Sequence, residues 1–142
     1  MILLDDDDNI KDDNILYNWI NASNNHAIDI LLFLLSDDIK IYDTIFEYIN
    51  GKENVKEFLY DLNHIFPNLH MKLISIISYT KKVIAAEIEL EGNQFGEFNG
   101  NPDLGNSFTI YSVFIFKLNT LGKILKIKIN MILDHFLINY KY

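Results

Sequence analysis

The sequence contains no cysteine, no arginine and only two prolines among its 142 residues. The absence of cysteine excludes disulfides, thiolate metal ligands and thiol nucleophiles. All 12 basic residues are lysine, and the formal net charge is −8 at pH 7. A chain without arginine lacks the bidentate fork that binds phosphate and guanine, and its negative charge disfavours polyanions. We therefore expect neither a nucleic-acid partner nor binding to an anionic membrane.

Long hydrophobic runs are also missing. The longest candidate, Ala27–Leu35, is interrupted by Asp29 and is much shorter than the roughly 20 apolar residues that span a bilayer. The acidic run Asp5–Asp8 differs from the basic start of a signal peptide, so we expect a cytoplasmic protein. Residues 1–13 are rich in charge and are predicted to form a frayed, solvated tail. We do not expect the Asp run to bind a cation, because the spaced ligands of a calcium loop are absent. Residues 14–142 are predicted to form a single domain.

Hydrophobic residues make up 49% of the chain, including 10 Phe and 8 Tyr. A chain of this length buries roughly two thirds of its unfolded surface, so it forms a core without disulfides or metals. His26, His64 and His70 show no zinc-binding spacing, and we predict no metal site. The apolar content exceeds what a simple core needs and leaves surface for a pocket or a partner.

Helical spacing of apolar residues dominates the first half of the chain. It predicts helices over Asn14–Ile20, His26–Leu35 and Gly51–Phe66, the last ending before a proline. Between the second and third helices, Ser36–Asp38 is predicted to be a turn and Ile39–Tyr42 a short strand.

After Pro67 the period changes to two, which is typical of strands. Short turns between the strands favour antiparallel hairpins. The sequence thus predicts an α+β domain in which helices precede an antiparallel sheet, with strands at Met71–Ser78, Lys82–Glu91, Phe108–Leu118 and Lys123–Leu133.

The strand Phe108–Leu118 is apolar on both faces. Phe108, Phe114 and Phe116 alternate with Tyr111 and Val113, so both faces need cover. The helices cover one face. We expect a second copy of the chain to cover the other, in a homodimer packed sheet to sheet.

Several short segments form an ordered pattern over roughly residues 14–137. They are Gly51-Lys52-Glu53-Asn54-Val55 with Phe58, Phe66-Pro67-Asn68-Leu69, Gly92-Asn93-Gln94-Phe95-Gly96-Glu97-Phe98-Asn99-Gly100, Gly105, Gly122-Lys123-Ile124 and Asp134. In this order they resemble the SnoaL-like proteins of the nuclear transport factor 2-like superfamily.

This resemblance implies a cone-shaped, strongly curved antiparallel sheet wrapped around the N-terminal helices and enclosing one pocket. It implies a cofactor-independent, polyketide cyclase-like enzyme, with isomerisation or dehydration as other reactions of the fold. The ligand would be a hydrophobic, carbonyl-bearing small molecule. A non-catalytic ligand-binding or dimeric scaffold module of the same fold is the alternative, because fold alone does not fix function.

Asp134 is the catalytic residue that the resemblance implies. A carboxylate at the end of an apolar strand is desolvated, which raises its pKa and suits a general acid or base. The other interpretation is that Asp134 ends the strand facing solvent. Strict alternation places it on the more polar face, with Asn130 and Lys128. Either that face lines a polar pocket, with the lysines beyond its mouth, or a bulge shifts the register.

Gln94 stands where the family usually has His, and it forms hydrogen bonds but does not titrate. It would therefore orient a carbonyl, or else serve only as a polar loop side chain. Seven other residues are expected to line the pocket, because they are apolar or aromatic or are predicted to point inward. For the aromatic ones, the alternative is an ordinary place in the core. The seven residues are Trp19, Tyr42, Phe58, Leu62, Phe66, Ile88 and Asn130.

Overall fold

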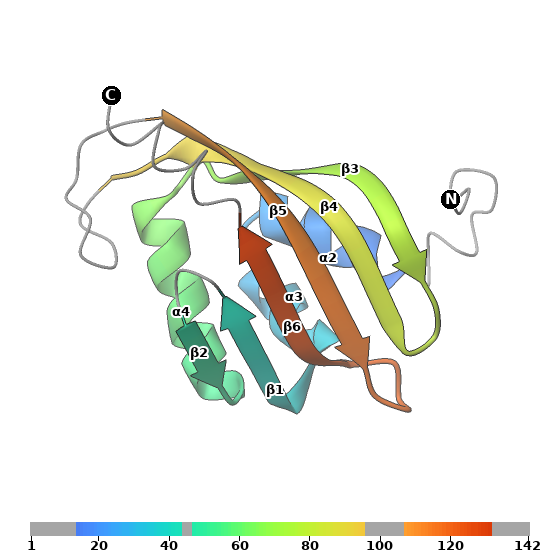
Figure 1. Ribbon diagram of the computed structural model, residues 1–142. Helices are drawn as coiled ribbons and strands as arrows, with labels where there is room; N and C mark the ends of the chain where they lie inside the picture. Colours follow the sequence, from blue (N-terminus) through green and yellow to red (C-terminus); the bar gives the residue numbers. More distant parts are fainter. Residues whose placement is uncertain (1–13, 44–46, 96–106, 132–142) are drawn as a thin grey trace.

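The computed structural model describes residues 14–43, 47–95 and 107–131, and its helices lie together on one face of a curved sheet (Figure 1). In chain order the elements are α2 (Ile15–Asn24), α3 (Ile28–Leu34), β1 (Leu35–Asp43), β2 (Glu47–Asn50), α4 (Lys52–Ile65), β3 (His70–Tyr79), β4 (Val83–Asn93), β5 (Ser107–Leu118) and β6 (Ile124–Met131).

The six strands form one open sheet in the order β2-β1-β6-β5-β4-β3. All neighbours are antiparallel except β1 and β6, which run parallel. The predicted α+β class and the helix-then-sheet order are confirmed. The sheet is nevertheless mixed, because β1 joins β6 only after a long connection through the rest of the domain, and such a crossover permits a parallel pair.

The first helix is one turn longer than predicted. Asn14 caps it, because its Oδ1 accepts hydrogen bonds from the backbone N–H groups of Leu16 (3.0 Å) and Tyr17 (3.2 Å). Near the other end, the Asn24 side chain donates to the Met71 carbonyl (2.9 Å) and accepts from the Met71 N–H (2.7 Å). Asn24 therefore ties α2 to β3.

The predicted turn at Ser36–Asp38 is wrong, because these residues belong to β1. The register of β1 against β6 shifts between Leu35 and Lys40, so the polar residues occupy an irregular stretch of the strand. Strand β2 was not predicted. It is four residues long and pairs only with β1, and so short an edge strand gives little periodic signal.

The core lies between the sheet and the helices. Alternate residues of β4 and β5 point towards the helices, as the sequence pattern predicted. On α4, Val55 and Leu59 are buried in the same layer, and Trp19 of α2 packs edge-on against Phe116 with ring centroids 5.9 Å apart. The buried residues of β4 and β5 are Ile84, Ala86, Ile88, Leu90, Phe108, Ile110, Ser112, Phe114 and Phe116.

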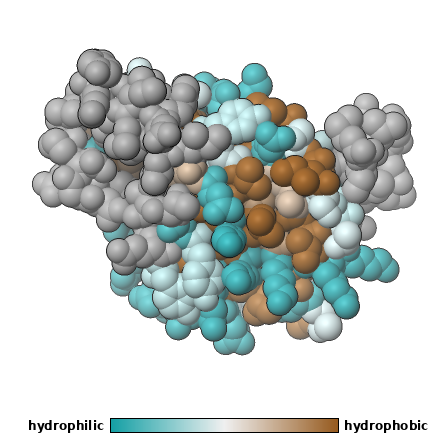
Figure 2. Space-filling model, in the orientation of Figure 1, coloured by the Kyte–Doolittle hydropathy of each residue, from teal (hydrophilic) through white to brown (hydrophobic). Residues whose placement is uncertain are grey.

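The opposite face of the sheet carries no helix in the described part of the chain. Figure 2 shows hydrophobic side chains gathered over the middle of this face, with hydrophilic side chains beside them. On β5 the apolar residues Val113 and Ile115 are half-buried, and on β3 Ile77 is 57% exposed. This face therefore combines an apolar centre with charged neighbours.

Candidate functional site

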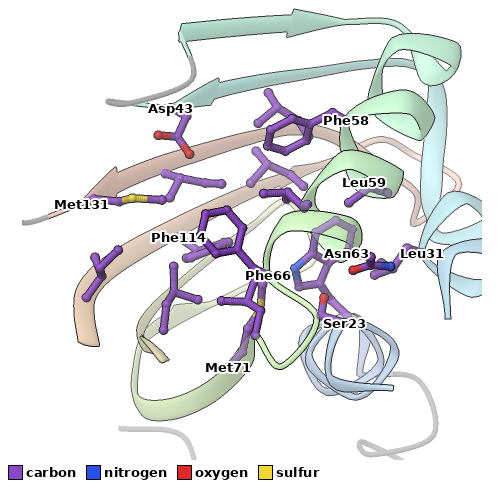
Figure 3. A pocket seen from close by; sticks show the side chains of 18 of the residues that line it. Ser23, Leu31, Asp43, Phe58, Leu59, Asn63, Phe66, Met71, Phe114 and Met131 are labelled. Atoms are coloured by element: carbon purple, nitrogen blue, oxygen red, sulfur yellow. The ribbon is translucent and has the colours of Figure 1, made fainter. Parts of the chain in front are cut away.

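A cavity of ≈ 110 Å³ lies between the sheet and helices α2, α3 and α4 (Figure 3). That is several times the roughly 10–15 Å³ that one water molecule needs. Most of its wall is aliphatic or aromatic. The lining residues are Trp19, Ser23, Leu31, Ile41, Asp43, Phe58, Leu59, Leu62, Asn63, Phe66, Leu69, Met71, Leu90, Phe108, Ile110, Phe114, Ile127, Ile129 and Met131.

Asp43 is the one ionisable side chain among these lining residues. It is the last residue of β1 and is 8% exposed. Ile39 and Ile41 on the same strand are buried, so alternation turns Asp43 towards the interior as well. In Figure 3 its carboxylate lies between β1 and the side chain of Met131. A carboxyl in an apolar cavity is the chemical feature that separates this cavity from ordinary core.

The sequence pattern does not predict Asp43 as a site residue. The predicted strand ends at Tyr42, so Asp43 falls in the connection that follows it. The signal was nevertheless present, because Ile39, Ile41 and Asp43 follow one two-residue period. Extending the strand by one residue would have placed the carboxyl on the buried face.

Two further polar side chains, Ser23 and Asn63, lie on the side of the cavity opposite Asp43 (Figure 3). Asn63 is on α4, and its Oδ1 lies 3.1 Å from Nδ1 of His26, so that oxygen is already engaged. Ser23 is on α2, one helical turn after Trp19. The cavity therefore has an acidic end and a neutral polar end separated by apolar wall.

Four of the residues predicted to line a pocket do so. Trp19 comes from α2, and Phe58, Leu62 and Phe66 come from α4 and its C-terminal cap. Phe66 also packs edge-on against Phe108 with ring centroids 5.4 Å apart. The apolar stripe of α4 thus contributes a wall of the cavity as well as core.

The other three predicted positions need correction. Tyr42 is 37% exposed and packs on Tyr48, with ring centroids 4.8 Å apart, on the side of β1 away from Asp43. Asn130 is in register with Val113 on that same outer face, because its neighbours Ile129 and Met131 point into the cavity. Ile88 is fully buried in the core without reaching the cavity wall.

Of the two predicted catalytic residues, Gln94 belongs to the described part of the chain. Gln94 follows β4 and is completely buried, but it is not among the residues that line the cavity. The adjacent Phe95 N–H donates to the carbonyl of Ile65 (2.7 Å) and so fastens this end of β4 to α4. Asp134 lies outside the described residues.

A separate polar cluster lies on the outer face of the sheet. Glu87 of β4 accepts hydrogen bonds from Ser75 (2.6 Å) and Tyr111 (2.8 Å) on the two flanking strands. The bond from Ser75, followed by that from Tyr111, lowers the pKa of Glu87 below its ordinary value of 4.5. The same carboxylate raises the pKa of Tyr111. Glu87 is therefore a fixed anion on this face.

Within residues 14–43, 47–95 and 107–131, no group of three or more His, Cys, Asp or Glu side chains could hold a metal ion. The helices of the same ranges include none that is long and apolar enough to cross a membrane.

Solved structures share the fold of this chain. A protein described as a SnoaL-like polyketide cyclase from Shewanella denitrificans OS-217 superimposes with a TM-score of 0.79 at 14% identity, covering 90% of this chain and 95% of that one. A second such protein, from Jannaschia sp. CCS1, gives 0.78 at 16% identity and 89% coverage of both chains.

A third structure, a protein with a ketosteroid isomerase-like fold from Catenulispora acidiphila in complex with trimethylamine, gives a TM-score of 0.74 at 14% identity, with coverage of 89% and 92%. At these identities the likeness is one of fold. The family model of the SnoaL-like polyketide cyclases matches residues 14–129. The chain therefore belongs to the SnoaL-like polyketide cyclase family. No curated protein matches it.

Proposed function

We propose that this protein is a cofactor-independent enzyme that moves a proton on a hydrophobic, carbonyl-bearing metabolite held in the cavity. The observation that carries the proposal is the Asp43 carboxyl in an otherwise mostly apolar wall. Apolar walls bind the carbon skeleton by burying its surface, and a carboxyl beside that skeleton is a suitable general acid or base.

The proposed chemistry begins with a proton on the carbon next to the ligand's carbonyl. A carboxylate oxygen takes that proton, and the electron pair of the C–H bond moves into an enolate. If the enolate carbon attacks a second carbonyl of the same molecule, a C–C bond forms and the π electron pair of that carbonyl moves to its oxygen. A proton added to this alkoxide completes the ring closure. If a proton returns at another carbon, the product is an isomer. The apolar wall holds the reacting atoms together, which supplies much of the rate gain.

Two carboxyls are candidates for this proton transfer. Asp43 lines the cavity, whereas Asp134 is proposed from the family resemblance and follows the cavity-lining Met131 by three positions in the sequence. We assign the abstraction to Asp43, and the donation of a proton to the product to the protonated carboxyl of Asp134. Exchange with water then removes the proton from Asp43 and restores the one on Asp134.

Exchange of the α-protons of cyclohexanone for deuterium, followed by NMR in D₂O, tests the first step without knowledge of the natural substrate. The protein should accelerate exchange, and Asp43→Asn should lower the acceleration by about 10²-fold or more. Asp38→Asn is the matched control, because Asp38 is an exposed carboxylate on the same strand. Equal loss in both variants, or no acceleration by the native protein, would overturn the proposal.

Asp134→Asn separates the two roles. Because Asp134 returns the proton, this variant should abolish overall turnover while leaving the fold intact, as judged by circular dichroism. Abstraction by Asp43 should continue in it. The proton held by Asp43 exchanges with D₂O, and the same carboxyl then delivers a deuteron back to the carbon, so deuterium exchange into cyclohexanone should persist. Unchanged turnover of a cyclising substrate by this variant would remove Asp134 from the mechanism.

The second candidate function is a non-catalytic module that binds a small hydrophobic ligand. Gln94 favours it, because this residue replaces the family's usual His and does not line the cavity. Cyclohexanone that binds the protein but exchanges its protons no faster than in buffer would establish this function in place of the enzyme.

We also propose that the protein forms a homodimer through the outer face of its sheet. Glu87 and Glu89 on β4 lie on one side of the apolar strip of β5, and Lys126 and Lys128 on β6 lie on the other. A two-fold axis in the interface, parallel to β5, places the glutamates of one copy over the lysines of the other. A two-fold axis in the interface but perpendicular to β5 would place glutamates over glutamates and lysines over lysines, which costs energy.

A further inference from the structure

One buried hydrogen-bond donor in the cavity region has no partner among the described residues. The indole Nε1–H of Trp19 meets no hydrogen-bond acceptor in the described part of the chain. Trp19 is 4% exposed, so bulk water does not satisfy this donor. A buried polar group without a partner costs free energy, and native proteins contain few of them.

The surroundings of Trp19 explain why the donor stays unsatisfied within the protein. The indole belongs to the cavity wall, and its ring packs edge-on against Phe116. Asn63, a polar group in the same wall, has its acceptor oxygen engaged by His26 (3.1 Å). The cavity is the space from which an acceptor that is not part of the described chain can approach.

A phenylalanine at this position would keep an aromatic ring, although a smaller one, without an unpaired N–H. The indole therefore imposes a cost that a purely structural aromatic would avoid. A ligand that brings an acceptor oxygen removes this cost when it binds, so the donor discriminates in favour of such ligands.

We propose that the indole N–H of Trp19 donates a hydrogen bond to the carbonyl oxygen of the ligand in this cavity. This makes Trp19 a positioning and specificity residue. That the ligand is a carbonyl compound rests on the proposed function. That the ligand carries a hydrogen-bond acceptor rests on the unpaired indole N–H itself.

The geometry also assigns an orientation. Asp43 comes from the end of β1, whereas Trp19 comes from α2, the helix that carries Ser23 on the side of the cavity opposite Asp43. A ligand whose oxygen meets the indole therefore extends its carbon skeleton towards Asp43. When a proton leaves that skeleton, negative charge develops on the oxygen, and a donor placed there stabilises it.

Two ligands of nearly equal shape test the proposal. Cyclohexanone carries a carbonyl oxygen where methylenecyclohexane carries a CH₂ group, so only the ketone accepts a hydrogen bond. Trp19 is the one tryptophan of the chain, and the ¹⁵N–¹H spectrum of the native protein therefore contains a single indole signal. The ketone should move its proton downfield, and the alkene should not.

Binding measurements give a second readout. The native protein should prefer the ketone over the alkene by about tenfold after correction for their partition between water and hydrocarbon. Trp19→Phe should abolish this preference. Asn21→Ala is the matched control, because Asn21 lies on the same helix, is exposed and is not part of the cavity wall, and this variant should retain the preference.

Equal indole shifts with both ligands, or a ketone preference that survives in Trp19→Phe, would overturn the proposal. Binding is measured without turnover, so a failure here is distinct from a failure of the proposed catalysis. If the indole shift appears but deuterium exchange does not, Trp19 keeps its role and the protein is a binding module.

Discussion

Asp43 of β1 and Ile129 of β6 are in register across the parallel ladder, and both side chains line the cavity. The carboxyl and the aliphatic side chain therefore stand side by side on neighbouring strands. Ile129 controls how much space is left beside the carboxyl.

Ile129→Phe should fill the cavity next to Asp43. We expect cyclohexanone affinity to fall at least tenfold, while the free energy of unfolding changes by less than about 1.5 kcal/mol, because the added carbons enter existing space. Ile124→Phe on the same strand is the control. Ile124 is fully buried and does not line the cavity, so overpacking there should cost about 1–3 kcal/mol. Calorimetric titration and urea unfolding measure the two quantities.

The Glu87 cluster predicts a pH effect on the outer face. The pKa of Glu87 is lowered in the folded protein, so its contribution to stability is present above the unfolded value of 4.5 and is lost as the pH falls through the lower folded value. Ser75→Ala should raise the pKa of Glu87 towards 4.5, and Tyr111→Phe should raise it less. A carboxyl ¹³C NMR titration measures these shifts. An unmoved Glu87 titration in Ser75→Ala would contradict the assigned cause.

The homodimer predicts a salt-sensitive association. Light scattering at micromolar concentration should give twice the chain mass, and Val113→Glu should give a monomer, because it places a charge in the apolar strip. The charge reversal Glu89→Lys should weaken the dimer, and Lys128→Glu in the same chain should restore it. Tyr60→Glu, on the exposed side of α4, serves as the control. A native protein that is monomeric at this concentration would contradict the proposed homodimer.

The cap of α2 predicts a local stability effect. Asn14→Ala removes the acceptor for two backbone N–H groups and should lower the free energy of unfolding by about 0.5–2 kcal/mol. Asn14→Ser keeps a capping oxygen and should retain most of the native free energy of unfolding. Urea unfolding of the three proteins compares them. Equal losses in both variants would mean that Asn14 stabilises the helix through packing.

The sequence predicted the parts of this fold that repeat a simple period. The alternation in β4 and β5 placed Ile84 and Phe114 in the core, and the apolar stripe of α4 placed Phe58 in the cavity wall. Local patterns failed where pairing is non-local. Ser36–Asp38 has the composition of a turn, but pairing with distant β6 draws it into a strand.

In the candidate site, too, features set by a local period could be predicted from the sequence, and features set by three-dimensional surroundings could not. Trp19 was predictable as an inward-facing aromatic of an amphipathic helix, but its unpaired N–H depends on which groups surround it in three dimensions. Asp43 was within reach of the period of β1 and was missed at the strand end. The outward direction of Tyr42 follows from that same period once the strand is extended.

The parallel β1–β6 ladder has a consequence for synthesis of the protein on the ribosome. Strand β1 emerges early, but the strand that pairs along its inner edge is among the last described segments to be made. Until β6 emerges, β1 has only the short β2 beside it, and the wall that carries Asp43 has no neighbour. The cavity is therefore completed only when β6 has left the ribosome, and a nascent chain truncated before Ile124 should bind no ketone.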